Sequence, residues 1–446
     1  MTNCLVFPRR PRYLLYTVDV SPDDFAVWAM PIFLVAIAVE VIMSRRYHPE
    51  RYAMGTALSD MAVGGVYQAI EVCIHGGLLW VYATAFQHAA PVQLDATAPL
   101  TWVFGLLAVD FLFYWWHRFS HVVNVLWAVH GVHHQGEDFN LAVALRQPAF
   151  EPLTWFLFYL PLAVLGVPPE VYIGSYAVNR FYQFWIHTEY IGKGPRWVEW
   201  IFNTASHHRV HHGVNEAYLD KNYGAVLIVW DRLFGTFEEE GVRPTYGTTV
   251  QLGSYNPVWA NLQHFVVCGR LFRASRTWRD RIRVWFAHPA WRPEGMDEQL
   301  ETSKLSAQAR LSAAKHRPRP SGRLGWYVLA QFVAFAPLLT VLVELQSSLA
   351  WWELGVGALV VIVGQAAMLG LVESRPWGVP LELMRLVGTG TLTVWLAHRF
   401  ASGELLALVA GSQAVYVLGS GVVLLALRRA LAASGATGAA GPAAAQ

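Results

Sequence analysis

Charged residues and cysteines are both scarce in this sequence, and their scarcity excludes several kinds of protein. Charged residues make up only 14% of the 446 residues, whereas hydrophobic residues reach 54%. Typical soluble domains carry about 25% charged residues. The three cysteines (Cys4, Cys73 and Cys268) have no paired spacing, which argues against a disulfide framework and a CxxC metal site. The composition therefore predicts a membrane protein in which any metal would be bound by histidines and carboxylates.

The net charge and the first residues give two further exclusions. The formal net charge is +2 and no nucleic-acid-binding motif occurs, so we expect no nucleic-acid partner. The basic residues Arg9, Arg10 and Arg12 have no adjoining apolar run with a small-residue cleavage site. We therefore expect no cleavable signal peptide.

Long apolar stretches predict the membrane spans, because a helix that crosses a bilayer needs roughly 20 mostly apolar residues. The apolar segment from Pro152 to His187 carries GVPPE at 166–170, and we expect it to form a helical hairpin that enters the membrane and returns. The other candidate spans are 25–43, 66–86, 99–116, 325–345, 350–372, 386–400 and 404–427. The fold class expected is thus all-α, a polytopic membrane protein with about nine spans.

The distribution of basic residues predicts the orientation and the domains. The polar block 188–324 holds 19 of the 33 lysines and arginines, so we expect it in the cytoplasm. Within it, RLFRASRTWRDRIR (270–283) is expected to lie as one helix against anionic headgroups. The expected segments are N-terminal membrane helices (1–98), a histidine-box domain (99–245), a cytoplasmic basic segment and linker (246–324), C-terminal membrane helices (325–431) and a disordered low-complexity tail (432–446). The membrane would be the inner membrane of a bacterium or the endoplasmic reticulum of a eukaryote.

Histidines are the most informative residues. Ten of the 17 lie between His117 and His212, in HRFSH (117–121), HGVHH (130–134), a lone His187 and HHRVHH (207–212). Positions i, i+3 and i+4 share one helix face, so each box is expected to direct two or three imidazoles at one point. Imidazole suits Zn, Cu, Fe and Ni, and eight or nine ligands predict two metal ions. Two irons could bring the activation of O2, which protein side chains alone do not supply.

The boxes and their surroundings resemble a known family. DFLFYWWHR (110–118), NRFYQFWIHTEYIG (179–192) and SHHRVHHGVNEAYLDKNYG (206–224) are similar to the fatty acid hydroxylase and sterol desaturase superfamily of membrane di-iron oxygenases. Within it, they most resemble the alkylglycerol monooxygenases and their bacterial relatives. The resemblance implies hydroxylation of a lipid carbon with O2 by two Fe ions. For an alkylglycerol, it implies release of a fatty aldehyde with tetrahydrobiopterin as reductant.

The resemblance also implies the metal ligands. These are His117, His121, His130, His133, His134, His187, His208, His211 and His212. His207 precedes the second HxxHH box and is either a tenth ligand or a support for the others. Many relatives have a further histidine where this chain has Gln183, so one iron is expected to have a weaker ligand, a water or an open position.

Carboxylates near the boxes are the next candidates. Glu137 follows the second box, where it would support the iron or bind the reductant, unless it is a solvated turn residue. Asp110 lies two helical turns before His117 and is expected to support a histidine. Glu71 and His75, four residues apart in an expected span, form a weaker pair. Further candidates for a supporting or pocket role are Asn140, Arg146, Asn179, Glu189, Asn203, Asn215, Tyr218, Asp220, Lys221, Asn222 and Tyr223.

Three functions remain open from the sequence. The first is an ether-lipid monooxygenase and the second is a hydroxylase or desaturase of a sterol or fatty-acyl lipid. The third is a non-catalytic metal-binding or transport protein, which the repeated boxes at one membrane face argue against. No cofactor-binding motif occurs, so electrons must come from a diffusible pterin or from a redox-protein donor that docks on the basic face around Arg270 to Arg283.

Overall fold

The fold is helical throughout the part of the chain that the structure describes. The computed structural model describes residues 22–249, 251–294, 315–318, 322–401 and 403–438, and within them the β-type pairing is limited to two isolated bridges. The all-α prediction is confirmed. Among these described residues, five segments are long and apolar enough to cross a membrane: Pro49–Ala89, Pro99–Val122, Gly322–Leu345, Trp351–Val372 and Gly403–Leu427.

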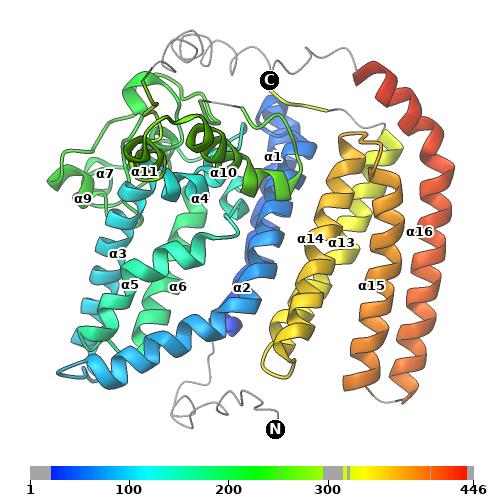
Figure 1. Ribbon diagram of the computed structural model, residues 1–446, viewed down its shortest axis with the longest axis horizontal. Helices are drawn as coiled ribbons and strands as arrows, with labels where there is room; N and C mark the ends of the chain where they lie inside the picture. The colour runs from blue at the N-terminus through cyan, green and yellow to red at the C-terminus, as the bar shows by residue number, and fades with distance from the viewer. Residues whose placement is uncertain (1–21, 250, 295–314, 319–321, 402, 439–446) are drawn as a thin grey trace.

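The helices fall into two groups that stand side by side (Figure 1). The first group consists of α1 (Pro22–Tyr47), α2 (Met54–Ala89), α3 (Pro99–Val122), α4 (Asn124–His134), α5 (Glu151–Val164) and α6 (Pro169–Trp185), with the short turns η2 (Pro49–Arg51) and η3 (Val143–Leu145). The second consists of α13 (Gly322–Leu345), α14 (Trp351–Val372), α15 (Gly378–Phe400) and α16 (Gly403–Gly438). Helix α2 joins them, because Leu58 and Ala62 belong to the core formed with α13 and α14, while Tyr82 belongs to the core formed with α3, α5 and α6.

A cap of short helices covers one end of the first group (Figure 1). It contains α7 (Arg196–Ile201), α8 (Ala205–His211), η4 (Glu216–Tyr218), α9 (Val229–Leu233), α10 (Pro257–Ala274) and α11 (Trp278–Phe286). The basic segment 270–283 is two helices rather than the single one expected. Helix α10 ends at Ala274, and the Thr277 hydroxyl accepts from the backbone N–H of Asp280 and so begins α11 anew.

The expected hairpin at 152–187 is present as α5 and α6. Gly166 lies between them with φ +83°, a left-handed conformation that favours glycine. The two helices have only 14 and 17 residues, fewer than the roughly 20 that a full crossing requires. This is one reason why five spans, rather than about nine, meet the criteria of length and composition. Another is charge, since α15 contains Glu382, Arg385 and Arg399.

The end of α3 turns the chain so that successive histidine boxes face one another. Val123 is extended between the two helices, with φ −115° and ψ 116°, and α4 begins at the next residue. The side chain of Asn124 donates to the carbonyl of Val284 at 2.6 Å and contacts His264 Nε2 at 2.7 Å, which ties α4 to α11 and α10. At the other end of the chain, α16 continues to Gly438, into the expected tail, and residues 439–446 lie outside the described residues.

Candidate metal centre

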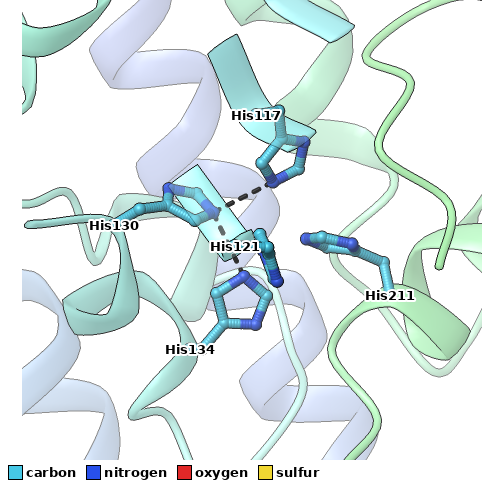
Figure 2. A group of neighbouring side chains, drawn as sticks. All are labelled: His117, His121, His130, His134 and His211. Carbon is cyan, nitrogen blue, oxygen red and sulfur yellow. Dashed lines mark hydrogen bonds between the residues drawn. The ribbon is translucent and has the colours of Figure 1, made fainter. Parts of the chain in front are cut away.

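Nine of the ten predicted histidines converge in two groups of buried imidazoles. In each group, ligand nitrogens lie within 4.8 Å of one another. The five-histidine group is His117, His121, His130, His134 and His211, which Figure 2 shows gathered around a common point. The four-histidine group is His133, His187, His208 and His212.

The two HxxHH boxes divide between these groups in a reciprocal way. On α4, His130 and His134 belong to the five-histidine group, and His133 belongs to the other. In the box on α8, His208 and His212 belong to the four-histidine group, whereas His211 crosses to the five-histidine group. Each box therefore directs two of its three imidazoles at one point, within the two or three that the spacing predicted, and the third joins the other group. Positions i and i+4 point one way, and i+3 is rotated far enough to reach the neighbouring group.

Backbone carbonyls fix which nitrogen of the rings carries the proton. Nδ1 of His133 donates to the carbonyl of Arg146 at 3.0 Å, and Nδ1 of His187 donates to that of Gln183 at 2.7 Å. In the other group, His117 Nδ1 and His211 Nδ1 make the same kind of bond to the carbonyls of Tyr223 and Lys221, at 2.7 and 2.9 Å. A neutral imidazole has one proton, so Nε2 of each ring presents a lone pair to the interior of its group.

These lone pairs face one another at distances that neutral rings alone do not explain. His133 Nε2 and His187 Nε2, both without a proton, lie 3.1 Å apart, and two lone pairs at that distance repel. In the five-histidine group, Nε2 of His121 and of His211 are buried with no hydrogen-bond partner among the described residues. A metal cation accepts lone pairs from several directions at once, so both groups fit a bound metal ion.

Burial keeps the histidines in the form that binds metal. Removal from water lowers the pKa of His187 to about 3 and lowers the pKa of His208 and His212 well below its usual value. These rings are therefore neutral at pH 7. A neutral imidazole has the free lone pair that a metal ligand needs.

The loop YLDKNYG (218–224) supplies two of the anchoring carbonyls. Asp220 and Asn222 have φ of 58° and 56°, a left-handed conformation that Asp and Asn tolerate better than most residues. The intervening Lys221 and the following Tyr223 thereby present their carbonyls to His211 and His117. Asp220 also lies 3.7 Å from His121 Nδ1 through its carboxylate.

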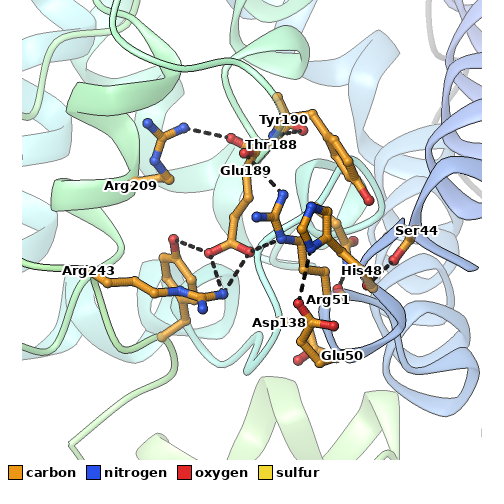
Figure 3. Close-up of polar contacts among 12 residues, drawn as sticks. Ser44, His48, Glu50, Arg51, Asp138, Thr188, Glu189, Tyr190, Arg209 and Arg243 are labelled. Atoms are coloured by element: carbon orange, nitrogen blue, oxygen red, sulfur yellow. Dashed lines mark hydrogen bonds and ion pairs between the residues drawn. The ribbon is translucent and has the colours of Figure 1, made fainter. Parts of the chain in front are cut away.

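Ion pairs hold the segment that carries His187. Glu189 pairs with Arg51 at 3.3 Å and with Arg243 at 3.2 Å (Figure 3). Arg209, which lies between His208 and His211 in the chain, donates to the carbonyls of Thr188 and Ile191. The Nε2 atoms of His187 and His208 lie 2.9 Å apart. The hydrogen bond between Thr188 and Arg209, the residues that follow them in the chain, holds the two rings at this distance.

His207 points away from both groups. Its Nε2 lies 2.8 Å from a carboxylate oxygen of Glu199, and its Nδ1 accepts from the backbone N–H of Thr204 at 3.4 Å. Of the two roles left open for this residue, the structure places it as a support at the beginning of α8. Its ring also packs edge-on against Phe237.

Glu137 and Asp110 lie near the groups but contact no member of either among the described residues. Glu137 accepts from the backbone N–H of His316 at 2.8 Å. Asp110 accepts from Asn179, from the backbone N–H groups of Val226 and Leu227 and from the indole of Trp230. Asp110 therefore acts on the loop that carries Tyr223, not on a histidine as expected.

The remaining predicted residues tie loops together around the groups. Arg146 forms an ion pair with buried Asp60 at 3.0 Å. Asn203 donates to the carbonyl of Gly224 at 2.6 Å, and Asn222 donates to that of His207 at 3.1 Å. Asn140, Asn215 and Tyr218 donate in the same way to the carbonyls of Arg51, Arg243 and Val242.

Sequence reasoning missed two buried carboxylates beside the groups. Glu151 lies 3.7 Å from His130 Nδ1 and pairs with Arg180 at 3.1 Å. Glu40, on α1, accepts from Thr188, the residue after His187, at 2.6 Å and from the backbone N–H of Leu141. Glu40 could have been found, because it is an ionisable residue inside an expected span. Glu151 lies next to an expected span and far from any box in the sequence.

An apolar cavity of about 250 Å³ leads to the four-histidine group. Helices α1, α2, α5, α6 and α13 contribute to its wall, and His187 and Gln183 lie at one end. Along α6 it extends from His187 to Tyr172, a length of roughly 20 Å at 1.5 Å per residue. On α6, Arg180, Gln183 and Phe184 line the cavity, whereas residues 111–116 of α3 do not.

Comparisons with known proteins show which family the sequence is similar to. A family model described as fatty acid hydroxylase matches residues 102–236. The chain is 33% identical over 332 residues to alkylglycerol monooxygenase of Xenopus tropicalis, covering 72% of each chain. It is 36% identical over 306 residues to that of Homo sapiens, covering 65% of this chain and 68% of the relative. Ornithine lipid hydroxylase OlsE of Rhizobium tropici is 34% identical over 232 residues, which is 48% of this chain and 68% of the relative. No solved structure matches the chain.

Proposed function

The chain belongs to the fatty acid hydroxylase family of membrane lipid monooxygenases, and we propose that it oxidises an ether lipid of the alkylglycerol type with O2 and two iron ions. The observation that carries this proposal is the pair of reciprocal imidazole groups beside an apolar cavity. A non-catalytic metal protein does not require an apolar cavity that reaches one of the groups.

Nine histidines would hold the metal. One ion would be bound by His117, His121, His130, His134 and His211, and the other by His133, His187, His208 and His212. When bound, the iron pair supplies the activation of O2 that attack on an unactivated C–H bond requires. The second group has only four histidines. Gln183 lies on the cavity wall, at the position where relatives are expected to have a further histidine. We propose that substrate or O2 occupies the space beside His187 that a fifth histidine would fill.

The protein's own residues position and protect this centre. Carbonyls hold Nδ1 of four rings, so their Nε2 atoms keep their direction without a metal. The nine rings are buried, so bulk water is kept from the reaction. The cavity binds the alkyl chain through apolar contacts and brings a carbon near the head of the lipid to His187.

The overall reaction balances with an external reductant. One oxygen atom of O2 enters the C–H bond beside the ether oxygen, and the other leaves as water with two electrons and two protons. The resulting hemiacetal breaks into a fatty aldehyde and glycerol. We propose that the electrons come from a reduced pterin, tetrahydrobiopterin, which reaches the centre from the cap side.

The test is turnover by purified protein with an alkylglycerol, O2 and one of two electron sources. Fatty aldehyde formed with tetrahydrobiopterin alone supports the proposal. Turnover of a sterol or fatty-acyl lipid, and only with a redox-protein chain, would assign the second function instead. In that case activity should fall with salt and in Arg276→Glu, since Arg276 is an exposed basic residue between α10 and α11.

A further inference from the structure

The cavity is apolar along most of its length but carries polar side chains near the histidines. Arg180 and Gln147 line it together with His187 and Gln183. The far part, along α2 and α6, is lined mainly by apolar residues such as Leu78, Leu79 and Ile173, with Glu71 and His75 of α2 among them. A lipid has the same division into a polar head and an apolar chain.

The contacts of Arg180 place it at the metal end of the cavity. Its Nη2 donates to the side-chain oxygen of Gln147 at 2.8 Å and to Glu151 at 3.1 Å. Glu151 in turn lies 3.7 Å from His130 Nδ1, and Gln147 follows Arg146, whose carbonyl anchors His133. Both partners of Arg180 are therefore next to an imidazole group. A guanidinium has five N–H donors, so donors remain for a ligand.

Trp155 adds a second donor to the same wall. It lies one helical turn after Glu151 on α5, lines the cavity and is only 6% exposed. Its indole Nε1 is buried and makes no hydrogen bond with any described residue. A buried donor without a partner is costly, and an acceptor oxygen on a bound molecule would remove that cost.

The charges around these donors favour an uncharged head. Arg180 is already paired with Glu151, which lies behind the cavity wall, and Glu71 places a carboxylate on the wall itself. A phosphate would be drawn to the guanidinium but repelled by two carboxylates in a site with little water. Hydroxyl and ether oxygens can accept from Arg180 and Trp155 without that repulsion.

We propose that Arg180 and Trp155 form a subsite for the uncharged, hydroxyl-bearing head of the lipid and thereby select the carbon that is oxidised. This inference rests on the proposed function. With the head held at Arg180 and the chain extended toward Leu78, the carbons next to the head lie nearest to His187. Loss of the anchor would let the lipid slide, so that carbons farther along the chain reach the centre.

The experiment compares wild type with Arg180→Lys, Trp155→Phe and, as a matched control, Arg118→Lys. Arg180→Lys keeps a positive charge beside Glu151 and so protects the fold, but it loses the planar fork that reaches two partners. Trp155→Phe keeps the ring and removes only the N–H. Arg118 lies on α3, does not line the cavity and donates to the hydroxyl of Tyr114. Bound iron is measured in every variant.

Two readouts separate an anchor from a structural role. The first is the KM ratio between an alkylglycerol and an alkyl methyl ether of equal chain length, which lacks hydroxyls. We expect wild type to prefer the alkylglycerol by about tenfold or more, and the preference to shrink toward unity in Arg180→Lys. The second is the position of oxidation, measured as the ratio of fatty aldehyde to alkylglycerol hydroxylated farther along the chain. We expect this ratio to fall in Arg180→Lys and Trp155→Phe and to stay constant in Arg118→Lys.

Several outcomes would overturn the inference. One is an unchanged KM ratio and product ratio in both subsite variants with iron retained. Another is a wild-type preference for alkylglycerol phosphate over alkylglycerol. A third is the same two shifts in His75→Leu instead, which would place the head at the far end of the cavity. Failure of wild type to oxidise any ether lipid while it binds iron would instead refute the proposed function.

Discussion

At the scale of single residues, two adjacent histidines differ in whether their rings face a metal group. His207 and His208 are adjacent, and both are buried, at 1% and 3% exposure. His207 faces Glu199, whereas Nε2 of His208 lies 2.9 Å from that of His187 and 3.1 Å from that of His212. Burial alone therefore does not identify a ligand. A ligand is identified by the direction in which its ring points.

This difference predicts the metal content of two matched variants. His208→Gln should lose metal from the four-histidine group and lose activity with it, because one of four lone pairs is removed. His207→Gln should keep its metal, because its ring points away, and should only weaken the beginning of α8, by about 1 kcal/mol. Metal analysis of both purified proteins checks this. A His207→Gln protein that stays folded but loses metal would contradict the placement of His207.

Glu137 provides a second prediction at this scale. Glu137→Gln should stay folded and keep its metal, because the amide oxygen can still accept from His316 and no histidine of either group contacts the residue. If the carboxylate serves the reductant, turnover should fall strongly and the KM for tetrahydrobiopterin should rise. Normal turnover with an unchanged pterin KM would leave Glu137 with only its contact to His316.

At the scale of elements, helix α2 holds the segment that anchors His133. Asp60 pairs with Arg146, and one turn later Gly64 lies against the carbonyl of Leu145, where an added Cβ would be 2.1 Å from the oxygen. The carbonyl of Arg146 then accepts from His133 Nδ1. The close contact between the backbones of α2 and η3 at Gly64 therefore helps to fix the direction of the His133 ring on α4.

Two glycines of α2 test this arrangement. Gly64→Ala should push η3 away, lower the free energy of unfolding by about 1–3 kcal/mol and reduce metal content. Gly76→Ala is the control, because its Cβ would meet nothing within 4 Å, and alanine should be neutral or stabilising by up to about 1 kcal/mol. Thermal unfolding in detergent and metal analysis measure both. Equal behaviour of the two variants would show that the contact at Gly64 does not position the centre.

At the scale of the whole molecule, the cap and the loop 90–98 lie at opposite ends of the first group of helices (Figure 1). Both imidazole groups lie at the cap end, where α3 ends and α8 lies. The cavity starts there and extends between the helices toward the other end. This arrangement suits a substrate whose chain lies in the bilayer while its head reaches the cap.

The arrangement predicts the topology in the membrane. With Cys4, Cys73 and Cys268 replaced, a cysteine at Lys193 should be labelled from the cytoplasmic side and one at Gln93 from the opposite side. Both positions are exposed, so labelling with a membrane-impermeant thiol reagent reports the side directly. Labelling of both from the same side would contradict a centre at the cytoplasmic surface with its cavity in the membrane.

The sequence by itself determined the class of the protein and the chemistry of its site. Scarce charge and long apolar stretches require a membrane fold, because a bilayer tolerates few charged residues. Nine histidines in closely spaced boxes, together with the lone His187, indicate metal binding, because ligand spacing on one helix is a local property that follows from 3.6 residues per turn. The hairpin at 152–187 could be predicted for the same reason, since a glycine-proline turn between apolar segments is a local signal.

Only the tertiary structure decided how these parts are combined. Helix periodicity turns the i+3 ring of each HxxHH box away from i and i+4, but which rings of α4 and α8 come together depends on how the two helices are placed, and no local pattern encodes that placement. Glu151 and Trp155 lie in no motif; Glu151 meets His130, and Trp155 meets the cavity, only because α5 packs against α2, α3 and α4. Long-range packing sets these positions, because it is decided by side chains far apart in the chain and not by the periodicity of any one segment.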